Sequence, residues 1–107
     1  MAERILIADD DAALRELLQT ILEDSDFDVI TVPSGEALIR AATQHQPDLI
    51  LIDIMMPGMD GLEALRQLRN DTRTSHLPMI LLTSLQNMDD EVVGFEGGAD
   101  AYTAKPF

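Results

Sequence analysis

The chain has 107 residues, 46% of them hydrophobic, which fits one folded domain and is too apolar for a disordered acidic segment. Its 7 basic and 20 acidic side chains give a formal net charge of −13, which repels phosphate backbones and anionic lipids, so we expect no direct binding to nucleic acid or membranes. Without cysteine, disulfides and thiolate chemistry are excluded, and the apolar runs are too short for a signal peptide or a membrane span, so we expect a cytoplasmic protein.

Five short apolar segments recur along the chain, and four of them lack polar alternation. In chain order they are residues 5–8, 29–32, 49–52, 79–82 and 101–104. Continuous apolar runs are typical of strands that are covered on both faces, as the strands of a parallel sheet are. We therefore predict a parallel sheet.

Helical patterns separate the predicted strands. The first carries an apolar stripe at helical spacing behind the capping residue Asp11, formed by Leu14, Leu17, Leu18, Ile21 and Leu22. A second helix is capped by Ser34 and ends before Pro47, a third follows Gly61, and a weaker fourth covers residues 89–96. This alternation predicts a doubly wound α/β fold, in which ligands bind at the carboxyl ends of the strands.

Polar side chains follow four of the five predicted strands. In chain order they are Asp9, Asp10 and Asp11, then Asp53, then Thr83 and Ser84, then Lys105. Asp11 is accounted for as a helix cap, but three adjacent carboxylates repel one another unless a cation offsets them. We therefore predict that Asp9 and Asp10 bind a metal, and oxygen ligands without His or Cys favour Mg²⁺. Thr83 supplies a hydroxyl at the same edge.

Asp53 interrupts an apolar run at the end of the third strand. The next helix is expected to begin beyond Pro57 and Gly58, where Asp60 is better placed to cap it. Asp53 is therefore predicted to serve chemistry, and carboxylates act as nucleophiles toward phosphoryl groups. Lys105, the only lysine of the chain, lies in an apolar stretch and needs an anionic partner, which the carboxylates supply.

Four segments together resemble the receiver domain of two-component response regulators, which has the CheY-like fold. They are residues 5–11, 48–61, 82–84 and 98–107, so the resemblance covers the whole chain. Each segment is a weak signal alone, whereas all four in this order and spacing are highly specific. The resemblance implies a five-stranded parallel sheet with the flavodoxin-like strand order 2-1-3-4-5.

The resemblance also implies a role for each residue at the strand ends. Asp53 is the phosphoacceptor, which takes its phosphoryl group from a phosphohistidine on a sensor histidine kinase or a histidine phosphotransfer protein. Mg²⁺, or Mn²⁺ in its place, is held by Asp9, Asp10, Asp53 and the backbone carbonyl of Met55. The remaining implied roles are phosphoryl contact by Lys105 and Thr83, access beside Ser84 and Met55, and conformational switching by Thr83 and Tyr102.

By this resemblance the domain is a phosphorelay switch, whose phosphorylation changes a surface that a downstream output protein or domain binds. It is not a conventional enzyme, although it catalyses its own phosphorylation and a slow dephosphorylation at Asp53. We expect dephosphorylation to be slow because Met55 and Leu85 occupy the positions that in the family flank the attacking water. Neither side chain can hydrogen-bond to that water or orient it.

Receiver domains normally continue into a fifth helix, whereas this sequence stops at Phe107. We therefore expect a receiver domain over residues 1–107 that lacks this C-terminal helix and any output domain. In the family that helix packs beside the first helix, so its absence is expected to expose apolar surface. A homodimer, a rearranged sheet or a marginally stable monomer is the expected consequence.

Three other functions are less well supported by the sequence. A Mg²⁺-dependent aspartyl-phosphate hydrolase needs a second aspartate two residues after Asp53, where Met55 stands. A flavodoxin-type flavin site needs a phosphate-binding loop after the first strand, where three aspartates stand. A degenerate receiver-like interaction module would lack at least one of the acidic pair, the acceptor, the hydroxyl and the lysine, and all of these are present.

Overall fold

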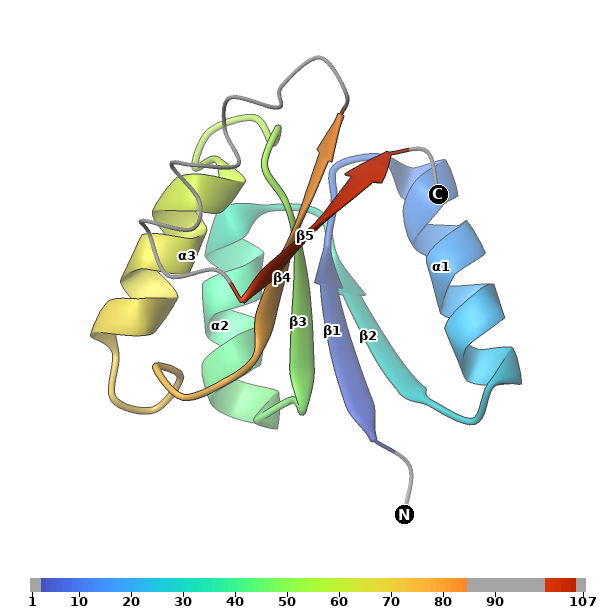
Figure 1. The fold of residues 1–107 in the computed structure, drawn as a ribbon, viewed down its shortest axis with the longest axis horizontal. Helices are drawn as coiled ribbons and strands as arrows, with labels where there is room; N and C mark the ends of the chain where they lie inside the picture. Colours follow the sequence, from blue (N-terminus) through green and yellow to red (C-terminus); the bar gives the residue numbers. More distant parts are fainter. Residues whose placement is uncertain (1–2, 85–99, 106–107) are drawn as a thin grey trace.

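The computed structural model describes residues 3–84 and 100–105, with side chains for residues 3–82 and 100. Within these ranges the chain forms a parallel sheet in the order β2-β1-β3-β4-β5 (Figure 1). The strands are β1 (Arg4–Ala8), β2 (Asp28–Val32), β3 (Leu49–Asp53), β4 (Met79–Ser84) and β5 (Ala101–Lys105). The predicted five-stranded parallel sheet and its flavodoxin-like order are therefore confirmed.

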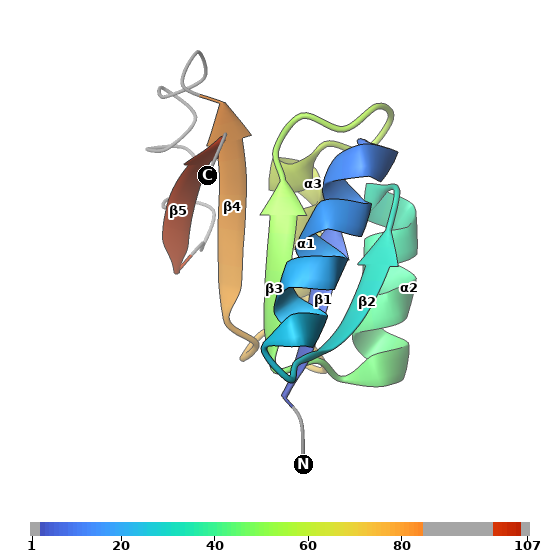
Figure 2. The same cartoon turned by 90° about the vertical axis from the view of Figure 1, so that its right-hand side faces the viewer.

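Three helices cover the sheet from both sides. They are α1 (Ala12–Asp24), α2 (Gly35–His45) and α3 (Gly61–Asn70). Figures 1 and 2 show α1 on one face, with α2 and α3 side by side on the other, as the predicted doubly wound fold requires. The fourth helix predicted at residues 89–96 lies outside the described residues. In the described part of the chain, no helix is long and apolar enough to cross a membrane.

The apolar strands supply two separate cores because alternate side chains point to opposite faces of the sheet. The core under α2 and α3 includes Leu6, Ala8, Ile50, Ile52, Met79 and Leu81. The core under α1 includes Ile5, Ile7, Val29, Leu49 and Leu51. Burial on both faces explains why the strand segments read as continuous apolar runs.

The three helices begin at capping side chains that the sequence identified. In each case a side-chain oxygen accepts a hydrogen bond from a backbone N–H in the first turn, at 2.9–3.2 Å. The pairs are Asp11 with Ala13 and Leu14, Ser34 with Ala37, and Asp60 with Glu63. Each such cap is worth about 1 kcal/mol. Because Asp60 caps α3, Asp53 is not needed for that purpose.

The apolar stripe of α1 is only partly buried. Leu18 is 8% exposed, whereas Leu17 and Ile21 are 54% and 51% exposed. Successive helical residues are about 100° apart, so the five apolar positions span about 140° of the helix surface, with Leu17 and Ile21 at one edge. The sheet contacts the other part of this arc, through Leu14, Leu18 and Leu22.

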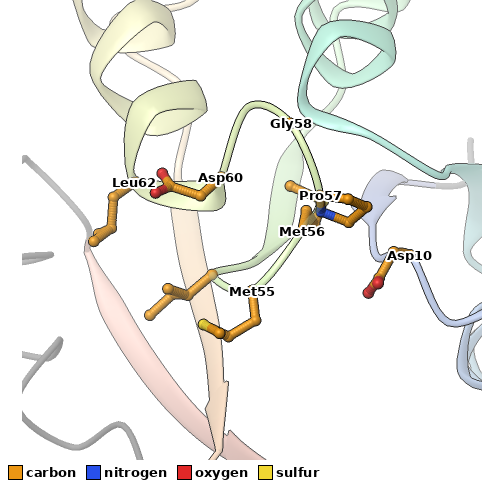
Figure 3. Close-up of a pocket in the computed structure, with 8 residues that line it drawn as sticks. Asp10, Met55, Met56, Pro57, Gly58, Asp60 and Leu62 are labelled. Atoms are coloured by element: carbon orange, nitrogen blue, oxygen red, sulfur yellow. The ribbon is translucent and has the colours of Figure 1, made fainter.

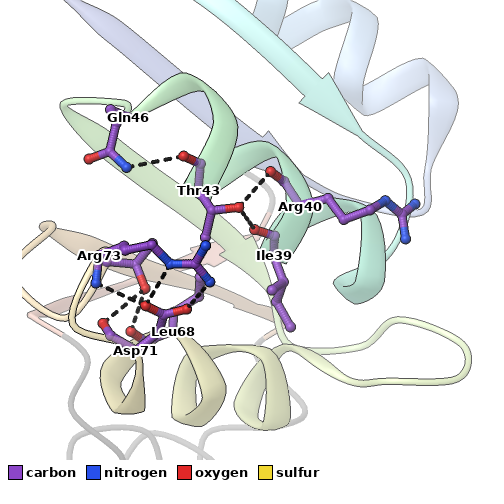
Figure 4. Close-up of polar contacts among 8 residues, drawn as sticks. Ile39, Arg40, Thr43, Gln46, Leu68, Asp71 and Arg73 are labelled. Atoms are coloured by element: carbon purple, nitrogen blue, oxygen red, sulfur yellow. Dashed lines mark hydrogen bonds and ion pairs between the residues drawn. The ribbon is translucent and has the colours of Figure 1, made fainter.

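Local polar contacts stabilise the carboxyl-terminal ends of α2 and α3 (Figure 4). At the end of α2, Gln46 adopts a left-handed backbone conformation with φ of 49°, and its side chain donates to the carbonyl of Thr43. After α3, the Arg73 side chain donates to the carboxylate of Asp71, which lowers the pKa of Asp71 to about 2. These contacts lie away from the carboxyl ends of the strands.

Candidate functional site

The strand register brings the predicted site residues to one edge of the sheet. Ala8 of β1 pairs with Ile52 of β3, so Asp9 and Asp53 follow neighbouring positions on adjacent strands. Asp53 in turn pairs with Leu82 of β4, and Ser84 pairs with Lys105 of β5. The backbones of Asp9, Asp53, Thr83 and Lys105 therefore meet at the carboxyl ends of the strands, where a doubly wound fold binds its ligands.

Three carboxylates form a compact acidic cluster at this edge. One oxygen each from Asp9, Asp10 and Asp53 lies within 4.8 Å of the others. Asp9 is 0% exposed and Asp53 is 4% exposed, whereas Asp10 is exposed. Three carboxylates so close together repel one another, and a bound cation would offset this repulsion.

Both buried carboxylates are oriented by a hydrogen bond from the backbone N–H two residues later. The Asp9 Oδ1 atom accepts from the N–H of Asp11 at 2.9 Å, and the Asp53 Oδ1 atom accepts from the N–H of Met55 at 3.2 Å. A carboxylate that bonds to the N–H two residues later fixes both itself and the turn that follows its strand. Each side chain is thus held by the first residues after β1 and β3.

The donor atoms of the cluster fit Mg²⁺. All three side chains offer hard carboxylate oxygens, and neither histidine nor cysteine belongs to the group found among the described residues. Mg²⁺ in proteins is typically bound by one or two carboxylates together with water and phosphate oxygens. The predicted magnesium site is therefore supported at the level of this acidic cluster.

A cavity of about 680 Å³ lies beside the cluster. Its lining comes mainly from the connection between β3 and α3, together with Asp10 and Leu62 (Figure 3). Met55 is 58% exposed and lies between Asp10 and Leu62 in this view. The cavity thus opens beside Asp10, the exposed carboxylate of the cluster.

The individual roles predicted for several residues are not tested by this geometry. Thr83, Ser84, Tyr102 and Lys105 are described as backbone positions of β4 and β5. Leu85 lies outside the described residues. Their roles in phosphoryl contact, access, switching and dephosphorylation therefore stay predictions.

One residue beside the cluster was not among the predicted site residues. The Arg15 Nη1 atom donates a hydrogen bond to the backbone carbonyl of Asp9 at 2.6 Å. A signal was available, because Arg15 is the only basic residue between Arg4 and Arg40 and follows three aspartates by four positions. The charge alone did not show which atom the side chain contacts.

Comparison with known proteins places the chain in a family. The family model described as "Response regulator receiver domain" matches residues 5–107. The DNA-binding response regulator MtrA of Mycobacterium tuberculosis is 42% identical over 107 residues, which are 100% of this chain and 46% of MtrA.

Two solved structures show the same fold. The chemotaxis protein CheY4 of Vibrio cholerae has a TM-score of 0.94 at 26% identity, with 100% of this chain and 89% of that chain covered. The receiver domain of the sensor histidine kinase PA1611 of Pseudomonas aeruginosa, which has a magnesium ion coordinated in its active-site cleft, has a TM-score of 0.91 at 28% identity. That comparison covers 100% of this chain and 88% of the other.

The chain spans about half the length of the curated relatives it matches. Since several of these relatives are named as DNA-binding regulators, our expectation of no direct nucleic-acid binding does not extend to a longer protein. It concerns only the acidic 107 residues. The matches favour a receiver over an aspartyl-phosphate hydrolase or a degenerate module. The chain belongs to the response regulator receiver domain family, with the CheY-like fold and the acidic pocket typical of phosphoacceptor receivers.

Proposed function

We propose that Asp53 accepts a phosphoryl group from a phosphohistidine on a sensor histidine kinase or a histidine phosphotransfer protein, in a Mg²⁺-dependent reaction. The observation that carries this proposal is the buried Asp53 carboxylate, grouped within 4.8 Å with the carboxylates of Asp9 and Asp10. The cavity lined by Asp10 and Met55 lies next to this group, and we propose that the donor enters there.

The chemistry is a substitution at phosphorus. An oxygen of Asp53 forms a P–O bond while the P–N bond to the donor imidazole breaks, and the electron pair of that bond returns to the imidazole nitrogen. The N–H of Met55 orients the Asp53 carboxylate for this step. A bound Mg²⁺ supplies positive charge that offsets the carboxylates and the phosphoryl oxygens.

The other site residues are proposed to bind the metal, contact the phosphoryl group, border its access route and transmit the conformational change. Asp9, Asp10, Asp53 and the Met55 carbonyl are the proposed metal ligands. Lys105 and Thr83 contact the phosphoryl oxygens, Ser84 and Met55 border the access route, and Thr83 with Tyr102 transmits the change. The strand register supports these assignments, since β1, β3, β4 and β5 end at the same edge of the sheet.

We further propose that phosphorylation controls a downstream output protein or an output domain of a longer cytoplasmic protein. The lengths of the relatives support this idea, because MtrA and its counterparts are about twice as long as this chain and are named as DNA-binding. Any contact with DNA would then belong to another segment, since this acidic domain repels phosphate backbones.

Intact mass spectrometry after incubation with acetyl phosphate tests the proposal. The wild-type chain should gain one phosphoryl group in the presence of Mg²⁺ and none when Mg²⁺ is chelated. Asp53→Asn should gain none, whereas Asp48→Asn, the same substitution just before the opposite end of β3, should react normally. A gain that persists in Asp53→Asn, or that forms equally without Mg²⁺, contradicts the assignment.

A further inference from the structure

We propose that Arg15 is a positioning residue for metal binding, which holds the turn of residues 9–11 so that Asp10 presents its carboxylate to the metal. The inference rests on the proposed Mg²⁺-dependent function. Its structural basis is the 2.6 Å hydrogen bond from Arg15 Nη1 to the carbonyl oxygen of Asp9. That carbonyl belongs to the peptide unit between Asp9 and Asp10.

The rest of Asp9 is fixed by independent contacts. Its N–H donates to the carbonyl of Val32 at 3.1 Å, which continues the sheet, and its Oδ1 atom accepts from the N–H of Asp11. The peptide unit that leads to Asp10 is therefore held on its carbonyl side by Arg15.

The orientation of the Asp10 carboxylate depends on that peptide unit more than the orientations of the Asp9 and Asp11 carboxylates do. Its carboxylate is exposed and accepts no hydrogen bond in the part of the chain that the structure describes, unlike those of Asp9 and Asp11. A rotation about ψ of Asp9 or φ of Asp10, the torsions on either side of this peptide, would move this carboxylate relative to Asp53. A hydrogen bond that prevents the rotation keeps the three acids together.

The helix places Arg15 for this task. The N–H of Arg15 donates to the carbonyl of Asp11 at 3.0 Å, so the residue sits on the first turn of α1. Long side chains on a helix point back toward its amino terminus, and Arg15 thereby reaches over the turn to Asp9. Among the described residues, no ion pair joins Arg15 to an acid. Arg15 therefore affects the carboxylates through its hydrogen bond to the backbone of Asp9.

Charge and positioning predict opposite results when Arg15 is removed. If the guanidinium acts only as a nearby positive charge, it repels Mg²⁺. Its loss then removes this repulsion and strengthens Mg²⁺ binding. If it positions Asp10, its loss weakens Mg²⁺ binding. Groups that orient metal ligands typically contribute about 10-fold to 100-fold in metal affinity.

Calorimetric titration with Mg²⁺ distinguishes a charge effect of Arg15 from a positioning effect. We expect the dissociation constant of Arg15→Met to rise about 10-fold, with a smaller rise for Arg15→Lys, whose ammonium keeps the charge and loses the planar fork. Arg40→Met is the matched control, since it removes the same charge from an exposed position on α2 and should leave the affinity within about twofold of wild type.

A second measurement reads the hydrogen bond without metal. The ¹³C shift of the Asp9 carbonyl and the ¹⁵N shift of the Asp10 amide should change in Arg15→Met and stay unchanged in Arg40→Met. Should Arg15→Met not fold, Arg15→Lys must show the same pair of effects in reduced size. Unchanged or tighter Mg²⁺ binding in Arg15→Met overturns the inference. A wild-type chain that binds no Mg²⁺ contradicts the proposed function itself, and the role of Arg15 falls with it.

Discussion

Gly61, the first residue of α3, lies directly against the backbone of Asp53. A Cβ atom built on Gly61 would be 2.2 Å from the Asp53 carbonyl oxygen and 2.8 Å from its carbonyl carbon. The N–H of Gly61 also donates to the carbonyl of Ile54 at 2.9 Å. The beginning of α3 therefore packs on the backbone of the candidate phosphoacceptor, and only glycine leaves room for this approach.

Gly61→Ala is expected to displace the end of β3 and to lower the free energy of unfolding by about 2–3 kcal/mol, because the added methyl group meets rigid backbone. Urea denaturation followed by circular dichroism measures this loss. Gly58→Ala is the control: its φ is 75°, but the nearest atom to the new Cβ is Glu36 Oε1 at 3.8 Å. We expect about 1 kcal/mol there, from backbone strain alone. Equal losses in the two variants would show that the contact with Asp53 does not constrain α3.

Asp100 ties the beginnings of β4 and β5 to the end of α3. Its Oδ2 atom accepts from the N–H of Met79 at 2.8 Å and from Arg69 Nη2 at 2.8 Å. The backbone N–H of Asp100 donates back to the carbonyl of Met79 at 2.9 Å. The hydrogen bond from Met79, with a smaller effect of Arg69, holds the pKa of Asp100 below its usual value against the opposing effect of burial.

A lowered pKa in the folded state means that the Asp100 contacts stabilise the fold above the unfolded value of about 3.9 and lose this contribution as the pH falls through the folded value. Asp100→Asn should therefore lower the melting temperature at pH 6, and the difference from wild type should shrink as the pH falls below the unfolded value. Asp24→Asn, at an exposed position in the last turn of α1, is the control and should change the melting temperature little at pH 6. A difference that is constant with pH would mean that the charge of Asp100 is unimportant.

The half-exposed edge of α1 gives a prediction about stability. Leu17→Gln and Ile21→Gln should each change the free energy of unfolding of this chain by less than about 0.5 kcal/mol, because both side chains are already about half in solvent. Leu18→Ala should cost about 2–4 kcal/mol, since Leu18 is buried against the sheet. Chemical denaturation of the three variants under one set of conditions compares them. A loss at Leu17 as large as that at Leu18 would mean that the outer edge is covered in solution.

The parts of the site that could be predicted are those that depend on strand ends. Asp9 and Asp53 were grouped correctly because parallel strands deliver their carboxyl ends to one edge, whatever the details of packing. Asp60 was recognised as a cap because capping depends on a few neighbouring residues.

The remaining features depend on contacts between segments and could not be predicted. The approach of Gly61 to Asp53 follows from how α3 packs on the sheet, and the bond from Arg15 to Asp9 follows from the path of α1 across the turn. Likewise, Leu17 and Leu18 are the same residue type and both belong to the predicted apolar stripe. Only the position of α1 over the sheet decides which of the two is buried.

Met55 lines the same cavity as Asp10 of the acidic cluster. Its side chain is 58% exposed, and its N–H donates to Asp53 Oδ1 at 3.2 Å. Such exposure argues against a role in packing alone, and the thioether of this side chain cannot act as a general base.

The phosphorylated domain should lose its phosphoryl group faster when Met55 and Leu85 are made polar. Hydrolysis needs a water in line with the P–O bond to Asp53, and side chains that can hydrogen-bond to this water orient it and assist its deprotonation. We expect Met55→Asn combined with Leu85→Glu to shorten the half-life at least about tenfold, as followed by intact mass after removal of acetyl phosphate. Met55→Leu, which keeps an apolar side chain of similar volume, should decay like the wild type. Equal or slower decay in the double variant would show that these two side chains do not set the lifetime, and the slow dephosphorylation expected from them would have to come from the rest of the site.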